Sequence, residues 1–258
     1  MNEIFLTEPV KPVDLDAELE QLSRRYQTAG GVGIQVLNMI GGQADSLLDR
    51  LPETVRLRLE DGTVKALNVA MKAAHGSRGV VGDQPAWLNT AVATAMGAAG
   101  GFAGLPGALA ELPVTTTVLL RAIQDVAVEH GFDPAAENVQ FDCIRVLSAA
   151  GPLEADDGAD LAFFATRASL QGVAVQTLIS RVAPKLATVL GQKLAAQTAP
   201  VLGAVAGAAT NYAYTSYYQQ IAHVHFRIRA LGIETDHPEE ELREALRQRV
   251  ALPGPRRA

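Results

Sequence analysis

The chain has 258 residues, of which 48% are hydrophobic, 19% are charged and only 5% are aromatic. This composition can form a sizeable core, and the net charge of −6 disfavours a nucleic-acid surface, which needs clustered Lys and Arg. The single cysteine, Cys143, excludes an intrachain disulfide and is consistent with a reducing compartment, the cytoplasm.

The first predicted helix follows an irregular leader over 1–13, which lacks the basic start and apolar run of a secretory signal. Asp14 can cap this helix by accepting hydrogen bonds from free N–H groups of the first turn. Gly30 and Gly31 are expected to end it. Its apolar residues share one face and are Leu15, Leu19, Leu22 and Tyr26.

Further helices are expected along the rest of the chain. The predicted ranges are about 34–51 with a break at Gly41 and Gly42, 52–74, 108–129 closed by Gly131, 136–149, 161–181, a helix that Pro184 begins, and 238–250. Residues 75–85 are expected to form a loop, and 151–160 an acidic turn. Because no segment shows strand alternation, the predicted fold is an all-α multi-helix bundle. One domain is expected over 14–250, with a disordered tail over 251–258.

Two segments are nearly free of charge. The first charge-poor segment, 84–120, contains only Glu111, and the second, 194–226, contains no Lys, Arg, Asp or Glu. Both carry glycines four residues apart, which lets two helix backbones approach closely. We expect both segments to form central helices of the bundle, because a helix that is apolar all round is normally buried.

An alternative is that these segments enter a bilayer or line a cavity for a lipid-like ligand. A tyrosine run over 212–218, beside Arg227 and Arg229, would suit a membrane interface or would cap the core. Pro106 and Pro113 oppose a plain membrane-spanning helix, since each removes a backbone donor. The chain also lacks an uninterrupted apolar run of about 18 residues.

Candidate binding residues lie on one stripe of the helix predicted over 108–130. The stripe is about 120° wide and contains Glu111, Thr115, Arg121, Asp125 and Glu129. Arg121 and Asp125 predict an i,i+4 ion pair. Glu111 and Asp125 are about 21 Å apart along the axis, too far for a paired-carboxylate mechanism. As the only charge in its segment, Glu111 is expected to be either a buried acid with a charged partner or a helix cap near the Gly-Pro break.

Asn211 and Tyr212 extend this candidate site. Asn211 interrupts the second charge-poor segment and is expected to form a hydrogen bond across to the first. A site between the two segments would use Glu111, Arg121, Asn211 and Tyr212.

No metal site and no cofactor are predicted. His223 and His225 point about 200° apart on a helix and cannot chelate one metal ion. The other histidines, His75, His130 and His237, are scattered along the sequence. The chain contains no nucleophile elbow, phosphate loop or dinucleotide fingerprint.

Three segments carry a resemblance to a known family: GLPGALAELPVTTTVLLRAIQDVAVEHGFD (104–133), LPETVRLRLEDGTVKALNVAMKAA (51–74) and APVLGAVAGAATNYAYTSYYQQIAHVHFRIRAL (199–231). They resemble the EcsC family, bacterial proteins named for a gene beside an ABC transporter. It spans roughly 30–231. The resemblance implies a bacterial cytosolic or membrane-associated protein with a loose link to transport, and it implies no particular activity.

The sequence leaves three functional hypotheses open. The first is a non-enzymatic helical protein that binds an apolar or lipid-like ligand, a membrane surface or a membrane-transport partner, in the cytoplasm or at the inner face of the membrane. The second is a hydrolase with a site around Glu111 and Arg121. The third is a structural homo-oligomer packed through its Gly-x-x-x-Gly faces.

Overall fold

The computed structural model describes residues 13–31, 33, 35–36, 47–78, 86–102, 104–149, 175–197 and 203–251. Across this part of the chain every regular element is a helix, which confirms the predicted all-α class. In chain order the elements are α1 (Leu15–Ala29), η1 (Leu48–Arg50), α4 (Glu53–Arg56), α5 (Leu59–Arg78), α6 (Ala86–Phe102), α7 (Gly104–Glu129), α8 (Glu137–Leu147), α10 (Val175–Gln197), α11 (Gly203–Thr235) and α12 (Glu239–Ala251).

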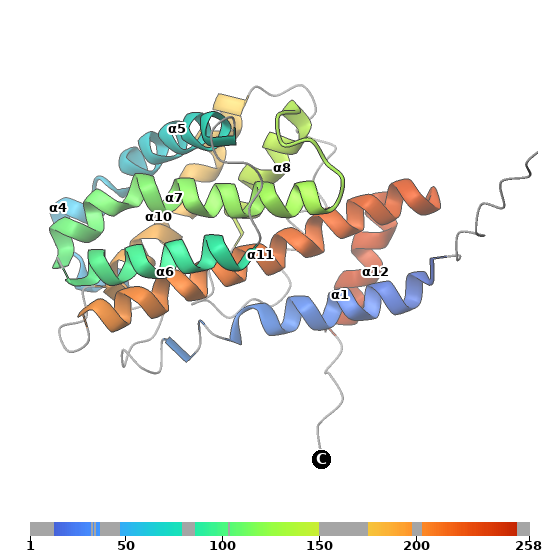
Figure 1. Cartoon of the computed structure of the whole chain (residues 1–258), viewed down its shortest axis with the longest axis horizontal. Coiled ribbons are helices and arrows are strands. Elements are labelled where there is room, and N and C mark those ends of the chain that lie inside the picture. The colour runs from blue at the N-terminus through green and yellow to red at the C-terminus, as the bar shows by residue number, and fades with distance from the viewer. Residues whose placement is uncertain are drawn as a thin grey trace, which may run out of the picture.

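Four long helices form the body of the bundle. In Figure 1, α5, α7, α6 and α11 lie side by side in that order, and α10 packs behind them. The short helix α8 packs against α7, α10 and α11, while α1 and α12 pack against α11 and against each other. Helix α11 has 33 residues and therefore extends about 50 Å. Its length makes it part of both ends of the bundle.

The two charge-poor segments pack against each other where α6 meets the N-terminal half of α11. A Cβ atom added to Gly97 of α6 would overlap the backbone carbonyl oxygen of Gly207 and the side chain of Asn211. Glycine at position 97 therefore allows the two backbones to touch. The predicted contact between these segments through glycine is confirmed.

The core consists mainly of aliphatic side chains, with a group of tyrosines from α11. Every residue of α7 over 119–127 is buried. Tyr214, Tyr217 and Tyr218 are also buried, and the Tyr214 hydroxyl donates to the Val189 carbonyl oxygen over 3.1 Å. The hydroxyl of a buried tyrosine usually finds such a partner. These three tyrosines therefore belong to the core, which agrees with the alternative that the tyrosine run caps the core.

Two predicted helix ends are confirmed by their hydrogen bonds. The Asp14 carboxylate accepts from the backbone N–H of Ala17 over 3.1 Å at the start of α1. Gly131 ends α7 with a φ of +82°. Its N–H and that of Phe132 donate to the carbonyls of Val128 and Ala127, a pairing that closes the last turn.

Some predicted boundaries are wrong. Residues 75–78 were expected in a loop but complete α5. The helix predicted over 52–74 is interrupted at Leu57 and Arg58, between α4 and α5. The helix predicted from 108 begins at Gly104, because Pro106 falls in its first turn, where a missing N–H leaves no hydrogen bond unmade.

Pro184 was predicted to begin a helix, but it lies inside α10. An internal proline costs about 3 kcal/mol. Buried aliphatic side chains on both sides of it, including Leu178, Val182, Leu186 and Leu190, each contribute about 1.5–3 kcal/mol. Their burial outweighs the lost hydrogen bond, so the helix continues.

Other predictions fall on residues outside the described part of the chain. These are the break at Gly41 and Gly42, the acidic turn over 151–160 and most of the helix predicted over 161–181. Among the helices that the structure does describe, none combines the length and apolar character needed to cross a bilayer.

The contact at Gly97 generates a stability prediction. We expect Gly97→Ala to lower the free energy of unfolding by about 1–3 kcal/mol, because the added methyl group meets rigid backbone of α11. Gly62→Ala in α5 is the matched control, since a Cβ there meets nothing within 4 Å. It should raise stability by about 0.4–1 kcal/mol. Urea denaturation measures both, and equal effects of the two substitutions would contradict the glycine contact.

Candidate functional site

One face of α6 organises the polar contacts of the central helices. Asn89, Ala93 and Gly97 follow each other at four-residue spacing and therefore lie on the same face of the helix. The Asn211 Nδ2 atom donates to the Ala93 carbonyl oxygen over 2.8 Å. The hydrogen bond predicted from Asn211 to the first charge-poor segment is thus confirmed.

Arg121 and Asp125 form the predicted i,i+4 ion pair on α7, with 3.0 Å between Arg121 Nε and Asp125 Oδ1. Asn89 of α6 donates to the other carboxylate oxygen over 2.9 Å. All three side chains are buried, whereas pairs of this spacing usually lie at the surface, where they stabilise a protein little. The Arg121 guanidinium therefore forms its ion pair inside the protein and not at the surface.

The candidate residues from the sequence are divided among several environments. Thr115 is buried on α7, and the side chain of Glu111 lies outside the described part of the structure. Tyr212 is 43% exposed and lines an open groove of about 600 Å³ between α6 and α11. The hydroxyl of Thr90 and the amide of Gln219 meet there over 3.1 Å. Asn211 is next to Tyr212 in sequence but points into the bundle.

His130 and His223 meet at the C-terminal end of α7, although 93 residues separate them in the sequence. One ring donates to the other, with 3.1 Å between His130 Nε2 and His223 Nδ1. Burial lowers the pKa of both rings, that of His223 to about 4. The sequence analysis did not predict this contact, because the two residues lie far apart in the chain. Within the described residues, no group of three or more His, Cys, Asp or Glu could hold a metal ion.

A second buried charged cluster joins α8 to α11. Asp142 lies 2.6 Å from Arg229 Nη1 and 3.3 Å from His225 Nε2. The Arg229 guanidinium also lies 4.4 Å from the centroid of the Phe132 ring. Burial lowers the pKa of His225 to about 4, although Asp142 acts in the opposite direction. Because these groups are enclosed, the cluster ties helices together and offers no surface to a ligand.

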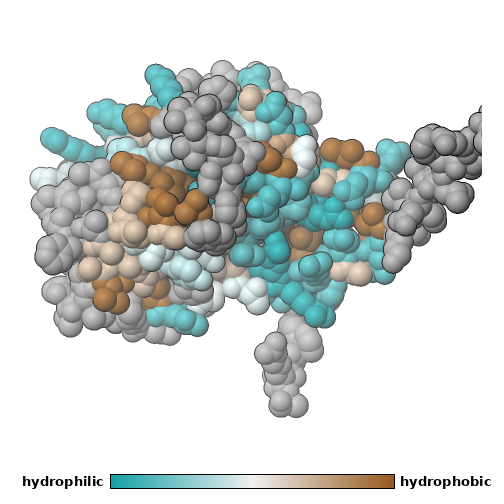
Figure 2. All heavy atoms as spheres, viewed as in Figure 1, coloured by the Kyte–Doolittle hydropathy of each residue, from teal (hydrophilic) through white to brown (hydrophobic). Residues whose placement is uncertain are grey.

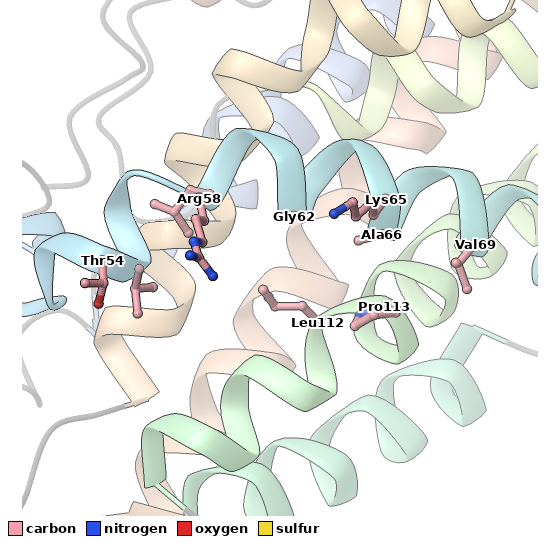
Figure 3. Close-up of a pocket in the computed structure, with 10 residues that line it drawn as sticks. Thr54, Arg58, Gly62, Lys65, Ala66, Val69, Leu112 and Pro113 are labelled. Atoms are coloured by element: carbon pink, nitrogen blue, oxygen red, sulfur yellow. The ribbon is translucent and has the colours of Figure 1, made fainter.

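A more accessible feature is the basic-edged groove, which we define as the groove between α4–α5 and α7. Its volume is about 510 Å³, and its walls are mainly apolar. Figure 3 shows the guanidinium of Arg58, in the turn before α5, extending into the opening above Leu112 of α7, and the ammonium of Lys65 directed along α5 toward Gly62. Gly62 lies between them in sequence and also lines the groove.

Exposed aliphatic residues line the basic-edged groove or are next in sequence to residues that line it. Leu57 is 77% exposed, Val69 is 52% and Val114 is 51%, and Figure 2 shows apolar side chains gathered over α7. Lys72, also exposed, continues the series from Arg58 and Lys65 at seven-residue spacing, which places the three bases along one side of the helix. This spacing around Gly62 was visible in the sequence, but the α5–α7 contact that makes a groove was not.

The fold and its grooves define an all-helical bundle whose charged candidate residues are mostly internal and whose accessible features are surface grooves. The chain belongs to the EcsC protein family: the family model matches residues 58–231, more than half of the chain. This region begins at Arg58, rather than near residue 30 as the resemblance suggested, and ends within α11. No curated protein and no solved structure matches the chain.

The Arg121–Asp125 pair generates a second stability prediction. We expect Asp125→Ala to lower the free energy of unfolding by about 3–5 kcal/mol, because it leaves Arg121 charged and buried without this partner. The control is Glu20→Ala, which breaks the exposed Arg24–Glu20 pair of the same spacing and should cost less than about 1 kcal/mol. Similar losses in urea denaturation would contradict the assignment of a buried pair.

The buried histidines predict acid sensitivity. An unfolded histidine binds a proton near pH 6.5, whereas His223 and His225 in the folded chain do so only near pH 4. The unfolded state therefore binds more protons between these values, and stability falls as pH is lowered through this window. Each histidine contributes a slope of up to about 1.4 kcal/mol per pH unit.

Chemical denaturation at several pH values between 6.5 and 5 measures this slope. His223→Asn should reduce the slope by up to about 1.4 kcal/mol per pH unit, the contribution of one proton, because Asn does not titrate. An unchanged slope in His223→Asn would show that this ring does not stay neutral in the folded protein.

Proposed function

We propose that this protein is a non-enzymatic peripheral protein that binds anionic membrane surfaces through the face formed by α4, α5 and α7. The observation that carries the proposal is that α4, α5, α7 and the turn between α4 and α5 carry both the basic-edged groove and exposed aliphatic side chains. Neither charge nor apolar contact has to supply the whole affinity.

The charges on this face support binding that depends on lipid composition. A basic side chain near an anionic membrane contributes about 1 kcal/mol, and Arg58, Lys65 and Lys72 are all exposed. Glu60 and Asp61 are exposed on the first turn of α5 and reduce this attraction. The chain as a whole also carries a charge of −6. A local basic patch with apolar contacts therefore suits a reversible, salt-sensitive association.

The structure gives the two other hypotheses less support. A hydrolase built around Arg121 would need this guanidinium at an accessible cavity, but it is buried and paired with Asp125. An oligomer packed through glycine faces would need those faces to be free, but Gly97 and Gly207 already contact each other within the chain.

Vesicle flotation tests the proposal. The protein should float with vesicles that contain phosphatidylglycerol and should not float with pure phosphatidylcholine vesicles. Arg58→Glu combined with Lys65→Glu should weaken binding to the anionic vesicles at least tenfold, as expected from about 1 kcal/mol per basic residue.

The matched control is Arg24→Glu combined with Arg247→Glu, which makes the same change in net charge at exposed sites on α1 and α12. These helices lie at the opposite end of the bundle from α4 in Figure 1. Equal losses in both double variants would show that only net charge matters, and no flotation of the unmodified protein would overturn the proposal.

A further inference from the structure

We infer that the basic-edged groove binds a single-chain lipid with a phosphate headgroup, the acyl chain lying between α5 and α7 and the phosphate between Arg58 and Lys65. The inference rests on the proposed function, because it places a ligand on the same face. It goes further, since a membrane surface can bind to charged side chains without any lipid entering the protein.

The dimensions and walls of the groove suit a hydrocarbon chain. A volume of about 510 Å³ is within the range of about 300–1,000 Å³ typical of small-molecule sites. Val55, Leu59, Ala66, Val69 and Leu112 contribute apolar surface. Such a surface favours burial of an acyl chain, because the chain leaves water.

Gly62 keeps part of this space open. It lies in the middle of the groove wall on α5, and a Cβ atom there would meet nothing within 4 Å. A glycine at this exposed helical position lowers helix stability relative to alanine. The packing of α5 does not require a glycine at position 62, in contrast to the packing of α6 at Gly97. The space beside Gly62 is therefore available to a ligand.

The two cations favour a phosphate over a singly charged headgroup. Arg58 and Lys65 both line the groove on either side of Gly62, with the Lys65 ammonium directed toward Gly62. A phosphate monoester carries a charge of about −1.5 to −2 near pH 7. The guanidinium of Arg58 can donate two parallel hydrogen bonds to phosphate oxygens. The Lys65 ammonium adds a second positive charge. This arrangement matches a phosphate head outside an apolar groove.

Isothermal titration calorimetry with monomeric lysophosphatidic acid, kept below its critical micelle concentration, tests the inference. The unmodified protein should bind one molecule, and it should bind lysophosphatidylcholine of the same chain length at least tenfold more weakly. Arg58→Gln combined with Lys65→Gln should remove this preference.

A groove-filling variant separates the lipid site from general membrane binding. Gly62→Trp should weaken lysophosphatidic acid binding at least tenfold while flotation with phosphatidylglycerol vesicles persists, because Arg58 and Lys65 remain. The matched control is Gly30→Trp at the end of α1, where a Cβ also meets nothing within 4 Å. It should change neither measurement, and thermal melts should show that both variants fold.

The outcomes distinguish the two proposals. If the protein floats with anionic vesicles but binds no lysophosphatidic acid, the groove inference fails and the membrane proposal stands. If Gly62→Trp binds the lipid as well as the unmodified protein does, the groove is not the site. If neither vesicles nor the monomeric lipid bind, both proposals fail.

Discussion

The backbone contact between Gly97 of α6 and Gly207 of α11 sets the spacing on which the central bundle depends. One turn before Gly97, the Ala93 carbonyl oxygen accepts a 2.8 Å hydrogen bond from Asn211. A further turn back, Asn89 reaches across to Asp125 of α7. Both hydrogen bonds are made by asparagine side chains, which are too short to bridge a wider gap between helices. The uncharged character of both segments follows, because long charged side chains could not be solvated between backbones packed so closely.

The sequence was sufficient to predict the fold class and the pairing of the two charge-poor segments. Regular apolar spacing identifies helices, and the glycine spacing identifies which faces approach one another. Helix boundaries were less predictable where tertiary packing overrides local preference. Pro184 has the local signature of a helix start, yet aliphatic burial on both sides keeps α10 continuous. Pattern analysis within one segment cannot detect this compensation.

The candidate site was predicted only in part, for a physical reason. The spacing of Arg121 and Asp125 predicts their ion pair, but not its burial, which depends on the helices that surround α7. His130 and His223 come together through the crossing of α7 and α11, which a single helical wheel does not contain. The basic-edged groove likewise depends on the distance between α5 and α7. Apart from the contact between the two charge-poor segments and the Asn211 hydrogen bond, the sequence revealed properties of single helices and not those that depend on how two helices pack.

Helix α11 contacts α6 through its N-terminal half, where Gly207 lies, and α1 through its C-terminal half, where Arg227 bonds Glu18 over 3.0 Å. One unbroken helix makes both contacts. If the packing at either end of α11 were lost, apolar surface of the same helix would be exposed, and the packing at the other end would be weakened. The two ends of α11 should therefore not exchange amide hydrogens independently, but open together as one cooperative unit. A chain whose first and last helices pack at one end of this long helix would thus unfold as a single thermodynamic body.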